Sequence, residues 1–267
     1  MSSYATTDLG DTVAFDLRGT GPAVVFVAGA GPHRAVDPAT TRTAELAAAR
    51  GLTTVVPDRL GRGESVASGH LGLQRELAML RTAIDAAGGR AVLVGHSSGC
   101  AISLAAAAAG LPVDGLVLWE APMDMDEDDV RAWIGEFERR LDDGDLDGAL
   151  AQYMKDMPPE WLEGARQDPS YPQIVADVVS YRADGEALVW AGSAPYAELS
   201  MPVLTLVGEH TFPGMTETAT AIAAALPSGR TATAPGRDHE WEPEPMADLL
   251  VEFVRDLHGQ PAARRTS

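Results

Sequence analysis

The 267-residue sequence contains a single cysteine, Cys100, and a single lysine, Lys155. One thiol cannot form an internal disulfide, and it excludes a metal site built from several cysteines. Basic residues are scarce as well: 20 Lys and Arg stand against 39 Asp and Glu, so the net charge is −19. A surface of that charge repels phosphate groups, which disfavours nucleic acid and an anionic membrane surface as partners.

Long hydrophobic runs are also missing from the sequence. The longest apolar run, residues 101–113, is rich in alanine and is broken by Gly110 and Pro112, so it is too short to span a membrane. Residues 1–11 lack the basic and apolar segments of a signal peptide. We therefore expect a cytoplasmic protein whose partner is a small-molecule substrate, and the sequence leaves a homodimer open. Residues 259–267 are expected to form a disordered tail.

Short apolar runs alternate with longer helical patterns along most of the chain. Continuous apolar runs of four to six residues are typical of strands that are buried on both faces. The predicted strands span residues 13–17, 23–27, 52–56, 91–94, 115–119, 202–207 and 231–234. The predicted helices span residues 43–50, 73–87, 98–109, 221–226 and 246–258. This alternation predicts an α/β fold with a mostly parallel central sheet flanked by helices.

One segment, residues 122–197, breaks the alternation because it has helical and loop patterns but no convincing strand. It is rich in acidic residues and in Met, Trp and Tyr. We interpret it as a helical cap over the carboxyl ends of the strands, where open α/β sheets bind ligands. Residues 1–121 and 198–258 then form the core domain. Most of the acidic residues are expected on a solvated helix face, and some of the aromatic residues are expected to face the pocket.

The pentapeptide Gly95-His96-Ser97-Ser98-Gly99 has the pattern Gly-x-Ser-x-Gly. A predicted buried strand leads directly into it, and an alanine-rich predicted helix follows directly. This setting is typical of a serine nucleophile held on a sharp turn above a sheet. Glycine is needed at positions 95 and 99 because a side chain there would collide with the neighbouring strand or helix. Ser97 is therefore the candidate nucleophile.

At this point the chain resembles the α/β-hydrolase superfamily, and the resemblance extends over nearly all of it. Residues 23–32 are similar to the strand and oxyanion loop of the family, and residues 57–65 to its Asp-x-x-Gly-x-Gly-x-Ser loop. The segment Trp119-Glu120-Ala121-Pro122 resembles small actinobacterial serine hydrolases, some of which place the catalytic acid after the strand that follows the nucleophile. The resemblance implies the α/β-hydrolase fold with a helical cap. The sequence shows no signature of a nucleotide cofactor and no metal cluster.

A serine hydroxyl is a weak nucleophile unless a base removes its proton. His239 lies between the last predicted strand and the last predicted helix, where the base of the family is found. His96 lies inside the turn and is expected to be structural, with its side chain directed away from Ser97. The other histidines occupy less suitable positions and are His33, His70, His210 and His258.

The acid that would orient His239 is missing from its usual place. Relatives often have Gly-x-x-Asp after the penultimate strand, whereas this chain has Gly208-Glu209-His210-Thr211, and threonine cannot stabilise an imidazolium ion by charge. Glu120 is the preferred candidate, because it ends a neighbouring strand and keeps the chain order nucleophile, acid, base. Glu209, Asp124 and the absence of any acid are the alternatives.

The backbone N–H groups of Ser98 and Ala30 are the candidate oxyanion-hole donors. Relatives usually have His-Gly where this chain has Ala28-Gly29. Together the residues predict a cofactor-independent, carboxylesterase-like serine hydrolase that cleaves a small, largely apolar ester, thioester or lactone through an acyl-enzyme. The alternatives are a lyase, C–C hydrolase or perhydrolase with the same triad, and a catalytically weak ligand-binding protein. A haloalkane dehalogenase or epoxide hydrolase is disfavoured, because those relatives need Asp at position 97.

Overall fold

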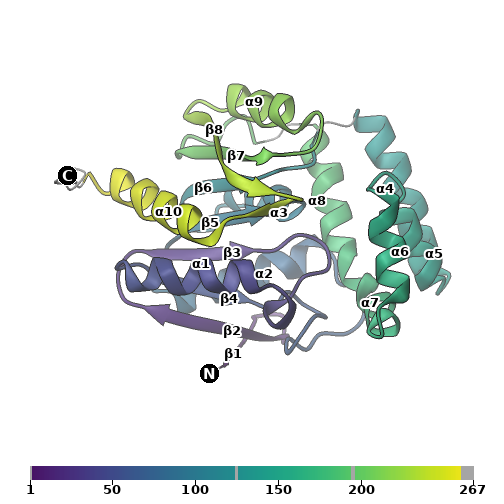
Figure 1. The fold of residues 1–267 in the computed structure, drawn as a ribbon. Coiled ribbons are helices and arrows are strands. Elements are labelled where there is room, and N and C mark those ends of the chain that lie inside the picture. The colour runs from purple at the N-terminus through teal and green to yellow at the C-terminus, as the bar shows by residue number, and fades with distance from the viewer. Residues whose placement is uncertain (1, 124–125, 194–195, 260–267) are drawn as a thin grey trace.

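The computed structural model describes residues 2–123, 126–193 and 196–259. Within these residues, nine strands form one sheet in the order β1-β2-β4-β3-β5-β6-β7-β8-β9 (Figure 1). Neighbouring strands from β4 to β8 are parallel, and the pairs at both ends of the sheet are antiparallel. The strands are β1 (Ser3–Thr6), β2 (Thr12–Gly19), β3 (Ala23–Val27), β4 (Thr53–Pro57), β5 (Ala91–His96), β6 (Val113–Trp119), β7 (Val203–His210), β8 (Gly229–Arg237) and β9 (Glu240–Trp241).

Helices cover both faces of this sheet. Helices α1 and α10 lie on one face, and α2, α3 and α9 lie on the other (Figure 1). The core helices are α1 (Pro38–Ala49), α2 (Leu73–Ala86), α3 (Gly99–Ala108), α9 (Met215–Ala225) and α10 (Pro243–Leu257), and a short 3-10 turn, η1 (Arg34–Val36), precedes α1. The predicted mostly parallel sheet flanked by helices is confirmed.

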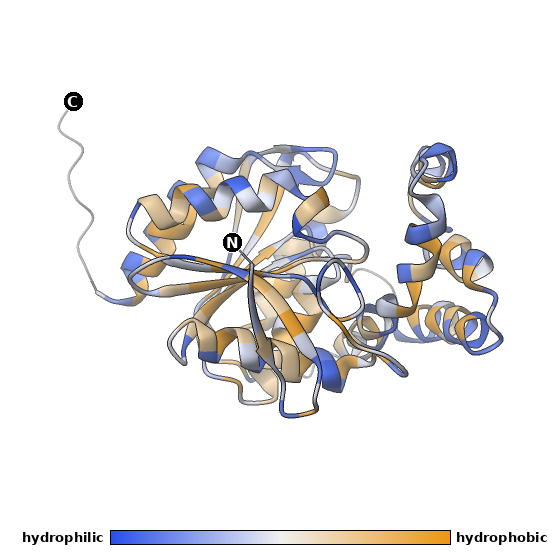
Figure 2. Ribbon diagram, turned by 90° about the horizontal axis from the view of Figure 1, so that it is seen from below, coloured by the Kyte–Doolittle hydropathy of each residue, from blue (hydrophilic) through white to orange (hydrophobic). Residues whose placement is uncertain are grey.

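Alternation along the central strands separates two hydrophobic clusters. In β3, Val24 and Phe26 join the cluster beneath α1 and α10, while Val25 and Val27 join the cluster on the opposite face. Successive side chains of a strand point to opposite faces, so a strand between two helical layers is apolar throughout. Figure 2 shows apolar residues along the strands and the adjoining helices.

Between β6 and β7 the chain forms a group of helices that projects from one end of the sheet (Figures 1 and 2). These helices are α4 (Glu127–Asp142), α5 (Leu146–Tyr153), α6 (Pro159–Gln167), α7 (Tyr171–Asp177), the 3-10 turn η2 (Val178–Tyr181) and α8 (Arg182–Gly192). Helix α8 packs against α3 of the core, and Phe137, Tyr153 and Leu188 belong to the same hydrophobic cluster as β5 and α3. We call this helical group the cap. The limits of the cap as a separate domain, residues 122–197, stay a prediction.

Two strands, β1 and β9, were not expected from the sequence. Both lie at the ends of the sheet and are short, with four and two residues. Their position at an edge leaves half of each strand exposed, so neither has the continuous apolar run that marks β3, β4 and β5.

Among the described residues, no helix has both the length and the apolar character needed to cross a membrane. Most of the expected tail, residues 260–267, lies outside the described residues, as does Asp124.

Candidate active site

Ser97 occupies a tight turn between β5 and α3. Its φ angle is 53°, in the left-handed region that non-glycine residues seldom adopt. A Cβ atom on Gly95 would lie 2.7 Å from the Cα atom of Cys100, and one on Gly99 would lie 2.2 Å from the carbonyl oxygen of Val27. Both glycines of the pentapeptide are therefore required by close packing, as the sequence pattern indicated. The turn holds a strained serine at the carboxyl end of a central strand.

Glu120 follows β6, the strand next to β5, and is 1% exposed. Its Oε2 lies 2.6 Å from Nδ1 of His239, and its Oε1 accepts a 2.9 Å hydrogen bond from the N–H of Gly208. Burial acts to raise the pKa of this carboxyl. Hydrogen bonds to His239, Thr211 and Gly208, together with the charge interaction with His239, outweigh that effect, so the pKa lies below its ordinary value. Glu120 is consequently a carboxylate at neutral pH.

His239 lies in the turn between β8 and β9, and its ring approaches Glu120 across 119 residues of sequence. Its φ angle is 72°, and that of Asp238 is 52°. The carbonyl oxygen of His239 accepts hydrogen bonds from Nε2 of His96 (2.8 Å) and from Nε1 of Trp119 (3.1 Å), which hold this strained turn in place. Because Nδ1 faces Glu120, Nε2 is the ring nitrogen left for proton transfer.

His96 lies beside His239, with the two ring centroids 4.8 Å apart. A carbonyl oxygen only accepts hydrogen bonds, so His96 must carry its proton on Nε2 to bind the backbone of His239. Burial and the adjacent His239 lower the pKa of His96 to about 4. His96 is therefore neutral at pH 7 and acts on the backbone of the turn, in keeping with its expected structural part.

The alternative acids are placed differently from Glu120. Glu209 is exposed near the end of β7, and the carboxylate that meets the His239 ring is that of Glu120. Asp124 lies outside the described residues. The carboxylate and imidazole that the sequence pairs are thus brought together, from the ends of two strands separated in the sheet by β7.

The early loop of residues 28–30 lies directly against the turn that carries Ser97. A Cβ atom on Gly29 would lie 2.9 Å from the Cβ atom of Ser97. The Ala30 N–H, however, donates a 3.1 Å hydrogen bond to Oγ of Ser98. That hydroxyl in turn donates to Oδ1 of Asp184 at 2.7 Å. One candidate oxyanion donor therefore already has an acceptor, an arrangement that the sequence did not reveal.

Comparison with known proteins identifies the family to which this fold belongs. The sequence model of the alpha/beta hydrolase family matches residues 24–253. An alpha/beta hydrolase from Sphaerobacter thermophilus is 30% identical, with a TM-score of 0.79, over 94% of this chain and 100% of that one. The chain belongs to the alpha/beta hydrolase family. No curated protein sequence matches this hydrolase significantly.

Other solved structures share the fold of this hydrolase at lower identity. An esterase from Thermogutta terrifontis is 24% identical, with a TM-score of 0.61, over 97% of this chain and 99% of that one. A haloalkane dehalogenase from Bradyrhizobium elkanii is 19% identical, with a TM-score of 0.68, over 97% of each chain. Because similar folds carry different chemistry, only the side chains at the site distinguish between such activities.

Two aromatic rings of the hydrolase lie near the His239 ring. The ring centroids of Trp161, on cap helix α6, and of Phe212, after β7, lie 6.2 and 6.0 Å from that of His239. The two rings also meet each other edge to face at 5.6 Å. Trp161 belongs to the cap aromatics of which some were expected at the pocket. Phe212 carried no signal in the sequence.

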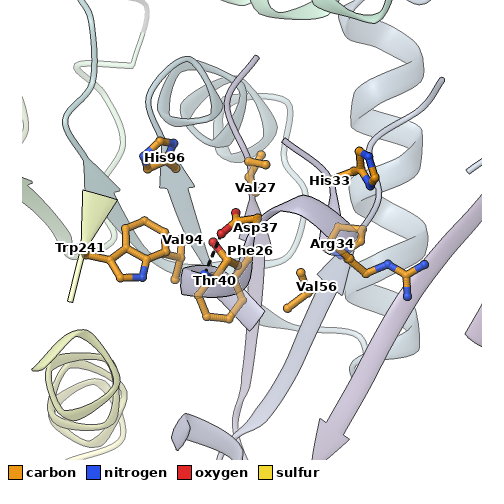
Figure 3. A pocket seen from close by; sticks show the side chains of 12 residues that line it. Phe26, Val27, His33, Arg34, Asp37, Thr40, Val56, Val94, His96 and Trp241 are labelled. Carbon is orange, nitrogen blue, oxygen red and sulfur yellow. Dashed lines mark hydrogen bonds between the residues drawn. The ribbon is translucent and has the colours of Figure 1, made fainter. Parts of the chain in front are cut away.

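A small cavity adjoins the site without containing the candidate nucleophile. Its lining includes His33, Asp37, His96 and Trp241, and neither Ser97 nor Glu120 belongs to it (Figure 3). His96 borders this cavity at the end of β5, and Trp241 meets the His96 ring edge to face at 5.3 Å.

Among the described residues, no three His, Cys, Asp or Glu side chains gather as metal ligands would. Cys100 is buried beside the turn.

Proposed function

We propose that this hydrolase is a serine hydrolase that cleaves a small, largely apolar ester, thioester or lactone without a cofactor. The observation that carries the proposal is the 2.6 Å contact between Glu120 and Nδ1 of His239, next to the strained turn of Ser97. A buried carboxylate on one nitrogen of an imidazole fixes the tautomer and leaves the other nitrogen able to accept a proton. The fold shared with esterases from Thermogutta terrifontis and Exiguobacterium antarcticum is consistent with this chemistry.

In the first half of the reaction, Oγ of Ser97 attacks the substrate carbonyl carbon while its proton passes to Nε2 of His239. Glu120 stabilises the imidazolium ion that forms. The negative charge that develops on the carbonyl oxygen is met by the N–H groups of Ser98 and Ala30. When the tetrahedral intermediate collapses, His239 returns the proton to the leaving alcohol or thiol, and the acyl group stays on Ser97.

Water completes the cycle. His239 removes a proton from the water molecule, whose oxygen attacks the acyl carbon, and the same proton is returned to Oγ of Ser97. The products are a carboxylic acid and the alcohol or thiol, so no oxidant, reductant or other reactant is consumed. For a lactone, both product groups remain in one molecule.

The apolar character of the proposed substrate is inferred from the surroundings of His239. The rings of Trp161 and Phe212 offer an aromatic surface close to the group that protonates the leaving oxygen. The net charge of −19 disfavours strongly anionic substrates by long-range repulsion. The surroundings of His239 are therefore suited to neutral esters with hydrocarbon substituents.

Labelling with a fluorophosphonate tests the proposal directly, because the reagent reacts with activated serine nucleophiles. The wild-type protein should be labelled at one residue, Ser97→Ala should not be labelled, and Ser228→Ala, at an exposed loop serine, should retain full labelling. A panel of p-nitrophenyl esters of increasing chain length then defines the acyl preference. Absence of labelling in a well-folded wild-type protein would contradict the proposal.

The catalytically weak ligand-binding alternative has one specific observation in its favour. The Ala30 N–H, a candidate oxyanion donor, is already bonded to Oγ of Ser98. If that bond does not yield to a substrate oxygen, each turnover loses a donor worth about 10²–10³ in rate. Ligand binding without ester turnover, together with absent labelling, would favour this alternative.

A further inference from the structure

A buried cluster of charged side chains lies between the cap and the loop of residues 28–30. Arg59 and Arg62 come from the loop after β4, Glu76 from α2 and Asp184 from cap helix α8, and each is at most 3% exposed. The two positive and two negative charges balance. Burying charges is costly unless they are paired and hydrogen-bonded, so a cluster of this kind is a strong geometric constraint.

Asp184 is the centre of this cluster and is fully buried. Its Oδ1 accepts hydrogen bonds from Nη1 of Arg59 (2.6 Å) and from Oγ of Ser98 (2.7 Å). Its Oδ2 accepts a bond from Nη2 of Arg62 (2.9 Å). One carboxylate of the cap thus binds three side chains of the core.

The same three side chains bind the backbone of three consecutive loop residues. Nη1 of Arg59 donates to the carbonyl oxygens of Ala28 (3.0 Å) and Gly29 (3.2 Å), and Nη1 of Arg62 donates to that of Gly29 (2.5 Å). Oγ of Ser98 accepts the N–H of Ala30 at 3.1 Å. Ala-Gly-Ala has no polar side chain with which to anchor itself, so these external bonds are what set the direction of its peptide groups.

We propose that Asp184 is a positioning residue that fixes the oxyanion loop from the cap, by holding Arg59 and Arg62 on the loop carbonyls and Ser98 Oγ on the Ala30 N–H. This inference rests on the proposed function, which gives the Ala30 N–H its part as an oxyanion donor. A donor stabilises a developing charge only if it is aligned before the charge appears, and the proposal requires the Ala30 N–H to share its hydrogen between Ser98 Oγ and the substrate oxygen. The cap therefore contributes to the chemical step as well as covering the site.

The main test compares two carboxylates of the same helix. Asp184→Asn keeps the shape of the side chain but removes its charge. Glu186→Gln is the matched control, because Glu186 also joins α8 to the core, through the N–H of Leu73 at 2.6 Å and Nε2 of His70 at 3.1 Å, without touching residues 28–30. We expect Asp184→Asn to lower kcat about 10–100-fold with KM within threefold of wild type, since a misaligned donor retains part of the 10²–10³ effect of a whole one.

For Glu186→Gln we expect both kcat and KM within about twofold of wild type, in line with other substitutions of partly exposed surface groups. An unchanged kcat in Asp184→Asn overturns the proposal, and so does a loss that appears only in KM or an equal loss in the control. A role confined to stability would lower the unfolding temperature without this selective change in kcat.

Ser98→Ala decides the question if Asp184→Asn fails to fold, because it leaves the ion pairs of Asp184 with both arginines intact. Removing the hydroxyl breaks the link from Asp184 to the Ala30 N–H. We expect kcat to fall about 3–10-fold, a weaker effect than loss of a whole donor. A rise in kcat would show instead that Ser98 Oγ competes with the substrate for that N–H, and it would overturn the proposal.

Hydrogen exchange separates this inference from the proposed function, because it does not depend on activity. The Ala30 amide should exchange at least about tenfold faster in Asp184→Asn or Ser98→Ala than in wild type, with no change in Glu186→Gln. Unchanged exchange would overturn the positioning of the loop, even if the enzyme is an esterase. If the wild-type protein is not labelled by a fluorophosphonate, the proposed function fails, while faster exchange still supports the hold of Asp184 on the loop.

Discussion

Two buried carboxylates of the site, Glu120 and Asp184, face different kinds of partner. Glu120, from the core, faces the imidazole of His239, the group proposed to carry the proton during ester cleavage. Asp184, from the cap, faces two guanidinium groups that stay charged at any pH the protein tolerates. The first pair can therefore change its charge during a reaction, and the second serves as a fixed framework.

The partners of the two carboxylates also differ in their exposure to solvent. The side chain of His239 is 16% exposed, whereas those of Arg59 and Arg62 are at most 1% exposed. A substrate can approach the imidazole but not the guanidinium groups. Similar buried carboxylates therefore have different roles, set by the partner that each one faces and by how far water is excluded from that partner.

The largest expected effect separates the two carboxylates by activity. Glu120→Gln should lower kcat for p-nitrophenyl acetate about 10³–10⁴-fold, because a glutamine neither fixes the required tautomer nor stabilises the imidazolium ion. Glu209→Gln, at an exposed position on β7, should stay within about twofold of wild type. A large loss of kcat confined to Glu209→Gln would show that Glu209, at the end of β7, is the acid that orients His239, and it would contradict the role given to Glu120.

The second prediction compares the contributions of Asp184 and Glu120 to stability. Asp184→Ala should lower the free energy of unfolding by about 3–5 kcal/mol, because it leaves two guanidinium groups buried without their shared partner. Glu120→Gln should cost less than about 2 kcal/mol, since the amide still accepts the N–H of Gly208. Urea denaturation at pH 7 measures both changes. If Asp184→Ala costs less than Glu120→Gln, the assignment of Asp184 to the framework is wrong.

A third prediction uses the pH dependence of stability, to which the buried His96 beside His239 contributes. The pKa of His96 is depressed in the folded state to about 4, so between about pH 6.5 and 4 the unfolded chain binds more protons and stability falls as the pH is lowered. From pH 7 to pH 5 this residue should account for about 1–2 kcal/mol of lost stability. The depressed pKa of Glu120 adds a loss only at still lower pH, as the pH falls through that value.

Urea denaturation of His96→Gln at pH 7 and pH 5 checks the third prediction. The variant should show a correspondingly smaller loss between the two pH values, whatever its stability at pH 7. His258→Gln, at the exposed end of α10, should keep the wild-type dependence. An undiminished loss in His96→Gln would mean that another group titrates.

The smallest expected effect concerns the part of the cap that faces the imidazole. Trp161→Ala should lower kcat/KM about tenfold for esters with long or aromatic substituents and much less for acetate, because it removes apolar contact beside His239. Trp190→Ala is the control and should not alter this preference, because the ring of Trp190, on α8, lies near that of Tyr196. An equal loss of kcat/KM for all esters would show that Trp161 stabilises the cap and does not contact the substrate.

Much of the core was predictable because its strands are buried on both faces. The bounds of β3 agree with the predicted run at residues 23–27, and those of α2 with the helical pattern at residues 73–87 to within one residue. Edge strands β1 and β9 could not be found, since they bury too little apolar surface. Within the cap, helical character was predictable, but the separate helices α4 to α8 were not.

The pairing of Glu120 with His239 was predictable because each residue adjoins the carboxyl end of a strand in the expected sheet. Asp184 was not, because in the sequence it is one acid among many on a cap helix. Its partners Arg59 and Arg62 lie more than 120 residues earlier in the chain. No local pattern reports a contact that exists only after the cap has packed on the core.

The sequence alone determined the fold family, the strained turn of Ser97 and the identity of the groups beside it. These features are predictable because each buried strand has its own apolar run, and because the tight turn requires glycine at fixed positions next to Ser97. Tertiary structure decided that Asp184 of the cap meets two arginines, and which acceptor the Ala30 N–H meets. Those outcomes depend on distances between elements far apart in sequence. They are fixed only when water has been excluded and each buried charge has found its partner.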